Sequence, residues 1–309
     1  MSRVLVRVDQ VLTKHYGVAP KESTSFTAER IGALRHNFHE HPLMQLKELE
    51  KLAQGLAPAG QCRFIAPGTR QDSPFRHKPV HPEGRQIGEI FRRIEEPGSW
   101  IALYNVETNP AYRDFIKDVV NCMRPQVERE QGPIFLETGF IFVSAPPSVT
   151  PFHIDRENNF WLQLKGRKTL NVWEPSDRAV VASPLVDDFI LYGSNVTFQE
   201  GYKERSLEFD VGPGEGVYFP STSPHMTRTD DSWARPGDAV SVSMGVNFYT
   251  RRTRRRAYVH AANMMLRKLG INPRHPGGSQ GLDGLKYPLG RAVVWARRMF
   301  RGYQPSSSF

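Results

Sequence analysis

The stretch at residues 149–175, VTPFHIDRENNFWLQLKGRKTLNVWEP, decides the fold. Its second half, 160–174, consists of short apolar, β-branched and aromatic runs interrupted by Gly166, a pattern typical of strands punctuated by turns. Similar runs lie on both sides of it, at 99–106, 134–145, 214–220 and 239–250. Many short strands with few long helices favour a sandwich or barrel, and a jelly roll can hold a metal in its mouth. The sequence therefore predicts a mainly β domain, a double-stranded β-helix of the cupin-like kind, over residues 96–250.

The region before this core, residues 1–95, has a mixed pattern. A helical pattern opens at Thr27 and continues through Ile31, Leu34 and Phe38. The other elements expected are a helix over 41–56, a strand over 60–68, an exposed loop over 65–85, a short helix over 87–95 and, inside the core, one helix over 111–128. We therefore expect three parts: a helical and strand region 1–95 packed on the core, the core 96–250, and a helical tail 251–309.

The tail carries the unusual charge of this chain. Residues 251–309 hold 13 of the 41 lysines and arginines but only one acid, Asp283. The remainder has 28 basic and 31 acidic residues, so the net charge of +9 comes entirely from the tail. The pattern predicts helices over 251–270 and 289–303 with a loop over 272–288 between them. A basic tail of this kind can contact an anionic partner.

The last predicted helix has two faces at 100° per residue. One side carries Leu289, Val293, Trp295, Ala296, Met299 and Phe300; the other carries Arg291, Arg297, Arg298 and Arg301, with Val294 as the exception. The helix can pack on its own domain, on a second subunit, or on an anionic membrane. The run RRTRRR at 251–256 can contact nucleic-acid phosphates or can be a solvated helix start. We favour packing or a homodimer through the C-terminal helices.

Composition excludes several other classes of protein. The two cysteines, Cys62 and Cys122, cannot build a disulfide framework or a cysteine-rich zinc site, which fits a reducing compartment. Arg3, Arg7 and Asp9 interrupt the first apolar residues, so they form no signal-peptide core. No apolar run is long enough to span a bilayer. We therefore expect a cytoplasmic protein.

Two residues within the opening stretch can bind one metal ion together. His153 and Asp155 are two positions apart, and residues i and i+2 of a strand point to the same face. A third ligand is available at His225, which follows a strand and a short Pro-containing loop. Two histidines and one carboxylate suit Fe(II) and leave three coordination positions open, although zinc or manganese can use the same ligands. Each residue alone has a plainer interpretation, because His-x-Asp is common by chance and a lone histidine is usually a surface or cap residue.

Lys168 adds a positive charge to this set. It follows Gly166 on a strand expected to run back beside the metal-bearing one, between apolar neighbours. Lys165 and Arg167 are its rivals, but the period of two places both on the opposite face from Lys168, Leu170 and Val172. A buried lysine requires a partner such as a carboxylate, with which it forms a charge-assisted hydrogen bond. A solvated strand lysine is the alternative.

The pattern T-P-F-H-I-D-x-x-x-N-F-W-L-Q-L-K-G-R-K at 150–168 resembles the JmjC (cupin-like) class of Fe(II)/2-oxoglutarate oxygenases. Within that class it is most similar to the asparaginyl hydroxylase that acts on hypoxia-inducible factor. The resemblance is specific over about 131–175 and weaker over 211–250, and the tail departs from it. It implies that His153, Asp155 and His225 bind Fe(II) and that Lys168 pairs with the distal carboxylate of 2-oxoglutarate.

The same resemblance implies five further contacts. Thr150 would hydrogen-bond to the distal carboxylate, and Asn159 would lie near the carboxylate at the metal. Asn247, in Val-Asn-Phe-Tyr at 246–249, would be another contact near the cosubstrate, and Tyr104 would be a further contact to the distal carboxylate. Tyr249 stands where the family has a tryptophan on the substrate side, which leaves the substrate open. Thr150 and the asparagines can also be ordinary turn or strand-edge residues.

Three functions fit these features. The first is an Fe(II)- and 2-oxoglutarate-dependent oxygenase that uses O2 to hydroxylate a peptide or protein side chain, with succinate and CO2 as coproducts. The second is a small-molecule oxygenase of a biosynthetic pathway, and the third is a non-catalytic cupin-like regulator. The complete ligand set argues against the third, and demethylation would use the same chemistry as hydroxylation. The stretch 176–208, which includes Asp187 and Asp188, is expected to shape the substrate entrance.

Overall fold

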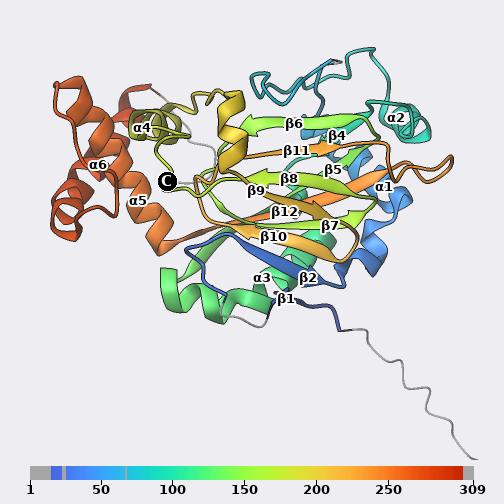
Figure 1. Cartoon of the computed structure of the whole chain (residues 1–309), viewed down its shortest axis with the longest axis horizontal. Helices are drawn as coiled ribbons and strands as arrows, with labels where there is room; N and C mark the ends of the chain where they lie inside the picture. Colours follow the sequence, from blue (N-terminus) through green and yellow to red (C-terminus); the bar gives the residue numbers. More distant parts are fainter. Residues whose placement is uncertain (1–14, 23–25, 67, 302–309) are drawn as a thin grey trace, which may run out of the picture.

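Two antiparallel sheets form the body of the molecule (Figure 1). The computed structural model describes residues 15–22, 26–66 and 68–301, so the ends of the chain, including the predicted close of the last helix at 302–303, lie outside the described residues. The larger sheet has the order β1-β2-β10-β7-β12-β5-β4-β3, and the smaller one has the order β6-β11-β8-β9. The strands of the core are β5 Ile134–Ser144, β6 Ser148–His153, β7 Asn158–Lys165, β8 Lys168–Val172, β9 Leu207–Val211, β10 Glu215–Phe219, β11 His225–Thr229 and β12 Ser241–Thr250.

The eight strands β5 to β12 are divided between the two sheets as in a jelly roll, and the chain changes sheet at every step except from β8 to β9. β5, β7, β10 and β12 lie in the large sheet, and β6, β8, β9 and β11 form the small one. Every residue of β12 is buried, and so is nearly every residue of β7, because both strands lie in the middle of the large sheet. The predicted double-stranded β-helix is confirmed by this strand order.

The N-terminal region completes the large sheet at both edges. β1 Val18–Pro20 and β2 Gly32–His36 extend it beyond β10, and β3 Cys62–Arg63 and β4 Trp100–Leu103 extend it beyond β5. The helix expected from Thr27 is therefore wrong, because Leu34 lies in β2 and pairs with Gly216. Leu34 is fully buried, and the open edge of β10 supplies the hydrogen bonds that override the weak helical period.

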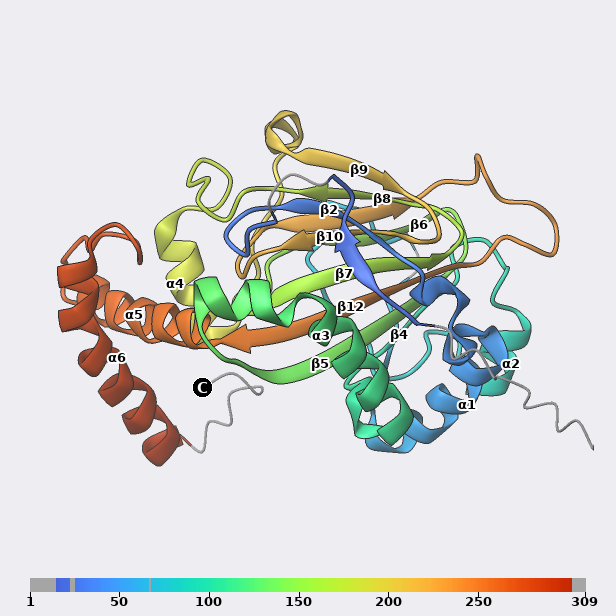
Figure 2. The same ribbon diagram turned by 90° about the horizontal axis from the view of Figure 1, so that it is seen from below.

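Helices pack on the large sheet and at its end (Figure 2). They are α1 Leu46–Leu56, α2 Ile87–Arg92 and α3 Pro110–Gln131, with short 3-10 turns at Phe38–Glu40, Pro42–Met44, Ala57–Ala59, Val106–Thr108 and Glu200–Arg205. Asn109 caps α3 by accepting a hydrogen bond from the Ala111 amide, with Pro110 in the first turn. The apolar face of α3, which includes Phe115 and Val119, packs into the main hydrophobic core with strand β5. α3 covers the outer face of the large sheet, so the face toward the small sheet is the one available for a functional site.

The C-terminal tail forms a helical unit at one end of the sheets (Figure 1). α5 Arg251–Lys268 follows β12 directly, and Thr250 and Thr253 form a reciprocal capping box at the junction. α6 Gln280–Arg301 begins earlier than expected, so the predicted loop 272–288 is helical in its second half. α4 Ser183–Tyr192, which was not predicted from the sequence, packs against α5. Over the described ranges, none of the helices is long and apolar enough to cross a membrane.

A buried ion network ties the tail to α4. Asp187 is fully buried and accepts hydrogen bonds from His260 Nδ1 at 2.6 Å and Arg267 Nε at 2.9 Å. The Asp187 carboxylate therefore faces α5, and the expectation that the stretch 176–208 shapes the substrate entrance stays a prediction. Two donors from one helix fix the position of α4, since a buried carboxylate is stable only when paired.

Replacement of Asp187 should loosen this junction. We expect Asp187→Ala to lower the free energy of unfolding by about 3 kcal/mol, because Arg267 and His260 lose their buried partner. Urea unfolding followed by far-UV circular dichroism measures the effect. Asp188→Ala, at a less buried neighbour, is the matched control, and equal midpoints for the two variants would contradict the assignment.

Candidate metal and cosubstrate site

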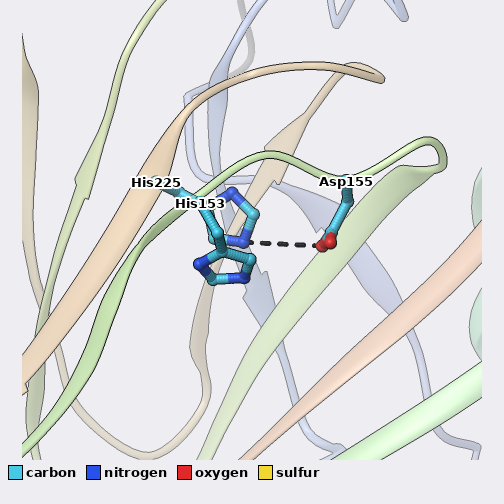
Figure 3. A group of neighbouring side chains, drawn as sticks. All are labelled: His153, Asp155 and His225. Atoms are coloured by element: carbon cyan, nitrogen blue, oxygen red, sulfur yellow. Dashed lines mark ion pairs between the residues drawn. The ribbon is translucent and has the colours of Figure 1, made fainter. Parts of the chain in front are cut away.

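Adjacent strands bring the three predicted metal ligands together at one end of the small sheet (Figure 3). His153 ends β6, His225 begins β11, and the two residues are paired in register. Asp155 lies in the short link from β6 to β7. Their potential ligand atoms all lie within 4.8 Å of one another, and they form the one such group of three among the residues described. The Nε2 of His225 is 3.5 Å from Oδ2 of Asp155.

Backbone carbonyls orient both histidines. Nδ1 of His153 is 2.8 Å from the carbonyl oxygen of Pro151, and Nδ1 of His225 is 3.0 Å from that of Ser223. A carbonyl only accepts, so each contact places the ring proton on Nδ1 and leaves Nε2 with its lone pair free. This is the usual arrangement for histidines that bind metal ions.

Burial also favours a bound cation. It holds the pKa of His153 well below its usual value, and the neighbouring His225 lowers it further, so the ring stays neutral. Burial raises the pKa of Asp155, because a desolvated carboxylate lacks hydration. A divalent ion at the centre would relieve that penalty. Two neutral imidazoles and a carboxylate are a donor set that fits Fe(II).

Lys168 enters the same cavity from the first position of β8. Its side chain is only 3% exposed, and its Nζ lies 3.5 Å from Ser144 Oγ and 3.4 Å from Ser243 Oγ. Burial lowers the pKa of Lys168 to about 7, and no carboxylate in the described ranges forms an ion pair with it. The two serines were not suggested by the sequence.

The rivals of Lys168 point away from the cavity. Lys165 pairs with Asp238, and Arg167 pairs with Asp210, both at the solvent-exposed surface. The period of two therefore correctly separated the inward lysine from its neighbours. An amine that is buried among hydroxyl groups without a counterion fits an anionic ligand.

Unpaired polar atoms lie in the wall beside Lys168. The cavity measures about 30 Å³, and its lining includes Thr150, Asn159 and Gly245 as well as the metal-ligand candidates. Oδ1 of Asn159 and Oδ1 of Asn247 are both buried without a hydrogen-bond partner. Both amides lie against Gly245, where a Cβ atom would come within 3.2–3.3 Å of them. A glycine that leaves room for unpaired amides fits a ligand site better than a packed core.

The two predicted tyrosines, Tyr104 and Tyr249, are not among the residues that line the cavity. The Tyr104 hydroxyl is hydrogen-bonded to the His77 ring at 3.2–3.3 Å. The hydroxyl groups hydrogen-bonded to Lys168 Nζ are those of Ser144 and Ser243. The role of Tyr104 at the distal carboxylate stays a prediction. The Tyr249 hydroxyl donates to the Glu157 carboxylate. Burial and the nearby Asp155 raise the pKa of Glu157 to about 7.

The loop expected to be exposed contributes to the site. Phe75 places its ring 4.1 Å from that of His153, and His77 follows it 4.3 Å away. The sequence carried one signal, because Phe75 is the single large apolar residue in the otherwise polar segment 66–79. An aromatic ring in such a segment usually packs on something.

Among known proteins, the chain is similar to solved structures only. No protein-family model and no curated protein sequence matches the chain. A structure of YcfD, a ribosomal oxygenase from Escherichia coli, is similar with a TM-score of 0.44 and 17% identity, over 94% of this chain and 69% of that chain. YcfD in complex with cobalt and 2-oxoglutarate gives a TM-score of 0.46 and 16% identity, over 93% and 69%. Likeness at this level leaves the chemistry of this chain to its own strands and side chains.

Proposed function

We propose that this chain is an Fe(II)- and 2-oxoglutarate-dependent oxygenase that hydroxylates a C–H bond of a peptide or protein side chain. The single observation that carries the proposal is one cavity in a jelly roll holding His153, Asp155 and His225 together with Lys168, a buried amine that lacks a counterion. Three metal ligands alone fit several metals and activities. The buried amine near them is what calls for an anionic cosubstrate.

The side chains divide the work of such a site. His153, Asp155 and His225 would hold Fe(II), and Lys168 with Ser144 and Ser243 would bind the distal carboxylate of 2-oxoglutarate. When bound, iron with 2-oxoglutarate and O2 supplies the oxidation of a C–H bond, with succinate and CO2 as coproducts.

The remaining groups would orient the cosubstrate and exclude water. Thr150, Asn159 and Asn247 would donate or accept hydrogen bonds along it, because their polar atoms lie in or beside the cavity wall. Phe140 and Phe142 line the same wall and keep it partly apolar. A water-poor cavity strengthens each charge-assisted contact.

A side chain carried by a polypeptide is the substrate class we favour. The cavity at the metal-ligand candidates is small, which suits one side chain reaching in from outside. A separate surface cleft of about 560 Å³, lined by Trp100, Ser148 and Arg70, offers room for the flanking chain. A small-molecule substrate and a non-catalytic regulator are the alternatives.

Turnover of the cosubstrate tests the proposal. The protein is incubated with Fe(II), 2-oxoglutarate and O2, and succinate is measured by NMR. We expect slow succinate formation without substrate, faster formation in the presence of a peptide substrate, and none above background with His225→Ala. Equal rates for the wild type and His225→Ala would reject catalysis at this site.

We also propose that the protein is located in the cytoplasm, a reducing compartment that its two free cysteines fit. We further propose that it forms a homodimer through α6. Its outward side carries a row of exposed apolar residues, with Leu285 74% exposed, Trp295 63% and Met299 64%. The inward side uses Val294, the exception in the predicted pattern, and Gly290 packs against the Tyr258 backbone. An exposed apolar row along a helix can be buried by packing against the same row of a second copy across a two-fold axis.

Trp295→Asp tests this interface. We expect the wild type to sediment as a dimer and Trp295→Asp as a folded monomer, because an aspartate in the centre of the row cannot be desolvated. Val80→Asp, at another exposed apolar residue on a loop, is the control and should stay dimeric. A monomeric wild type would contradict the dimer and leave an anionic membrane or nucleic acid as the partner of the basic tail.

A further inference from the structure

A segment of the N-terminal region crosses the barrel next to the metal-ligand candidates. We call residues 71–78 the strap. The carbonyl oxygen of Gln71 accepts a hydrogen bond from the Phe152 amide at 3.0 Å, and the Gln71 side chain donates to the Thr227 carbonyl at 3.3 Å. At the other end, Lys78 and Phe64 exchange backbone hydrogen bonds of 2.7 and 2.9 Å. Both ends of the strap are therefore fastened to the fold.

Between these anchors the strap turns alternate residues toward the barrel. Gln71, Ser73, Phe75 and His77 are half-buried, whereas Asp72, Pro74, Arg76 and Lys78 are exposed. This alternation is that of an extended chain with one face on a surface. Phe75 and His77 are the inward aromatic residues of the strap.

Phe75 and His77 form an aromatic wall that starts at a metal-ligand candidate. The Phe75 ring lies 4.1 Å from the His153 ring, His77 lies 4.3 Å from Phe75, and Trp100 stacks on His77 at 6.0 Å. The cavity lining includes the polar Lys168 and Thr150, and the strap meets this lining where Phe75 packs on His153. The site thus has a polar side that fits the cosubstrate and an aromatic side at the strap.

The size of the cavity limits what can enter. The cavity of about 30 Å³ is small, so only a slender group can enter beside the ligands in this arrangement. Phe75 is half-buried and its ring packs on the ring of His153, so it covers one side of that metal-ligand candidate. A substrate C–H bond that approaches the metal from the strap must therefore lie next to the Phe75 ring.

We propose that the strap is the substrate-side wall of the site, that Phe75 is its specificity-determining residue, and that Phe75 is itself hydroxylated when no substrate is bound. This inference rests on the proposed oxygenase function. In the step, one oxygen atom of O2 enters a ring C–H bond of Phe75 to give C–OH, and the other enters succinate. Oxidative loss of CO2 from 2-oxoglutarate supplies two electrons and the C–H bond supplies two, which together reduce O2.

Peptide mapping reads this modification directly. Trypsin cleaves after Arg70 and Arg76, and so releases 71–76, QDSPFR, which contains no Met, Trp, Tyr or Cys that would oxidise adventitiously. The full chain is incubated with Fe(II), 2-oxoglutarate and ¹⁸O2, and succinate is measured in parallel. We expect one ¹⁸O atom on Phe75, and none when 2-oxoglutarate is omitted.

A second readout does not depend on turnover. Co(II) is loaded in place of iron, and its transfer to a chromogenic chelator is timed. We expect Phe75→Ala to release Co(II) roughly tenfold faster than the wild type, because the ring no longer shields the ligand side from solvent. Arg76→Gln, at the exposed neighbour on the same strap, should stay within about twofold of the wild type.

The outcomes separate this inference from the function on which it rests. Succinate formation with ¹⁸O on Phe75 and faster metal release from Phe75→Ala supports the strap as the substrate-side wall. Succinate formation with ¹⁸O on another residue, or with equal release rates for Phe75→Ala and Arg76→Gln, overturns the inference and leaves the oxygenase proposal standing. Absence of succinate overturns both.

Discussion

Lys168→Met is expected to weaken 2-oxoglutarate binding roughly a hundredfold while making the ligand-free protein more stable. The loss of affinity follows because a buried charge-assisted pair is removed, and truncating one partner of such a pair costs about 2–5 kcal/mol. The gain in stability follows because the amine is buried without a counterion. A methionine fills the same space without a desolvation penalty.

The pH dependence of this gain has a definite sign. The pKa of Lys168 is lowered from 10.5 to about 7 by burial, so the unfolded chain holds one more proton than the folded chain between these values. Stability of the wild type therefore rises with pH across that window. The advantage of Lys168→Met is then on the order of 5 kcal/mol at pH 7 and below, and it declines toward pH 10.

Two measurements check this prediction. Urea unfolding of both proteins without 2-oxoglutarate, at pH 6 to 10, gives the stability difference, and calorimetric titration with 2-oxoglutarate and Co(II) gives the affinity. Lys165→Met is the matched control, because that exposed lysine pairs with Asp238 at the surface. A less stable Lys168→Met protein with unchanged affinity would make Lys168 a structural lysine.

Asp155→Asn is expected to lower the affinity for Co(II) or Fe(II) on the order of a thousandfold. The substitution keeps the shape of the side chain but removes the negative charge from the three-ligand group. Loss of a residue that only supports a ligand already costs about 10–100-fold in metal affinity, so loss of the ligand itself costs more. Calorimetric titration with Co(II) measures the change, and Asp188→Asn is the control. Equal affinities for these two variants would show that metal binds elsewhere.

The sequence predicted the site better than it predicted the edges of the fold. Strand periodicity correctly turned Lys168 inward, and the structure brings His153, Asp155 and Lys168 into one cavity with His225. The expectation that His153 and Asp155 share a strand face is wrong, because β6 ends at His153 and Asp155 lies in the link that follows. Strands β5, β7, β8, β10 and β12 could be predicted from their apolar and β-branched runs, whereas β9 and β11 were missed. The helices α3 and α5 also carried clear start signals, Asn-Pro before α3 and Thr250 before α5.

The remaining features depend on contacts between distant segments. Residues near Leu34 have a pattern that fits a weak helix, and only the open edge of β10 makes them a strand. The pairing of Asp187 with His260 and Arg267 joins α4 to α5, which no local pattern encodes. The strap has no periodic apolar pattern, so its course past His153 follows from anchors on β6 and β11.

The most direct test of the central claim is an anaerobic titration. The protein is reconstituted with Fe(II), 2-oxoglutarate is added, and the weak visible charge-transfer band of the iron chelate is recorded for the wild type and for His153→Ala. We predict a saturable band in the wild type that is absent from His153→Ala. A wild type that binds Fe(II) but gives no band with 2-oxoglutarate, or a band of equal intensity in both proteins, would contradict the account.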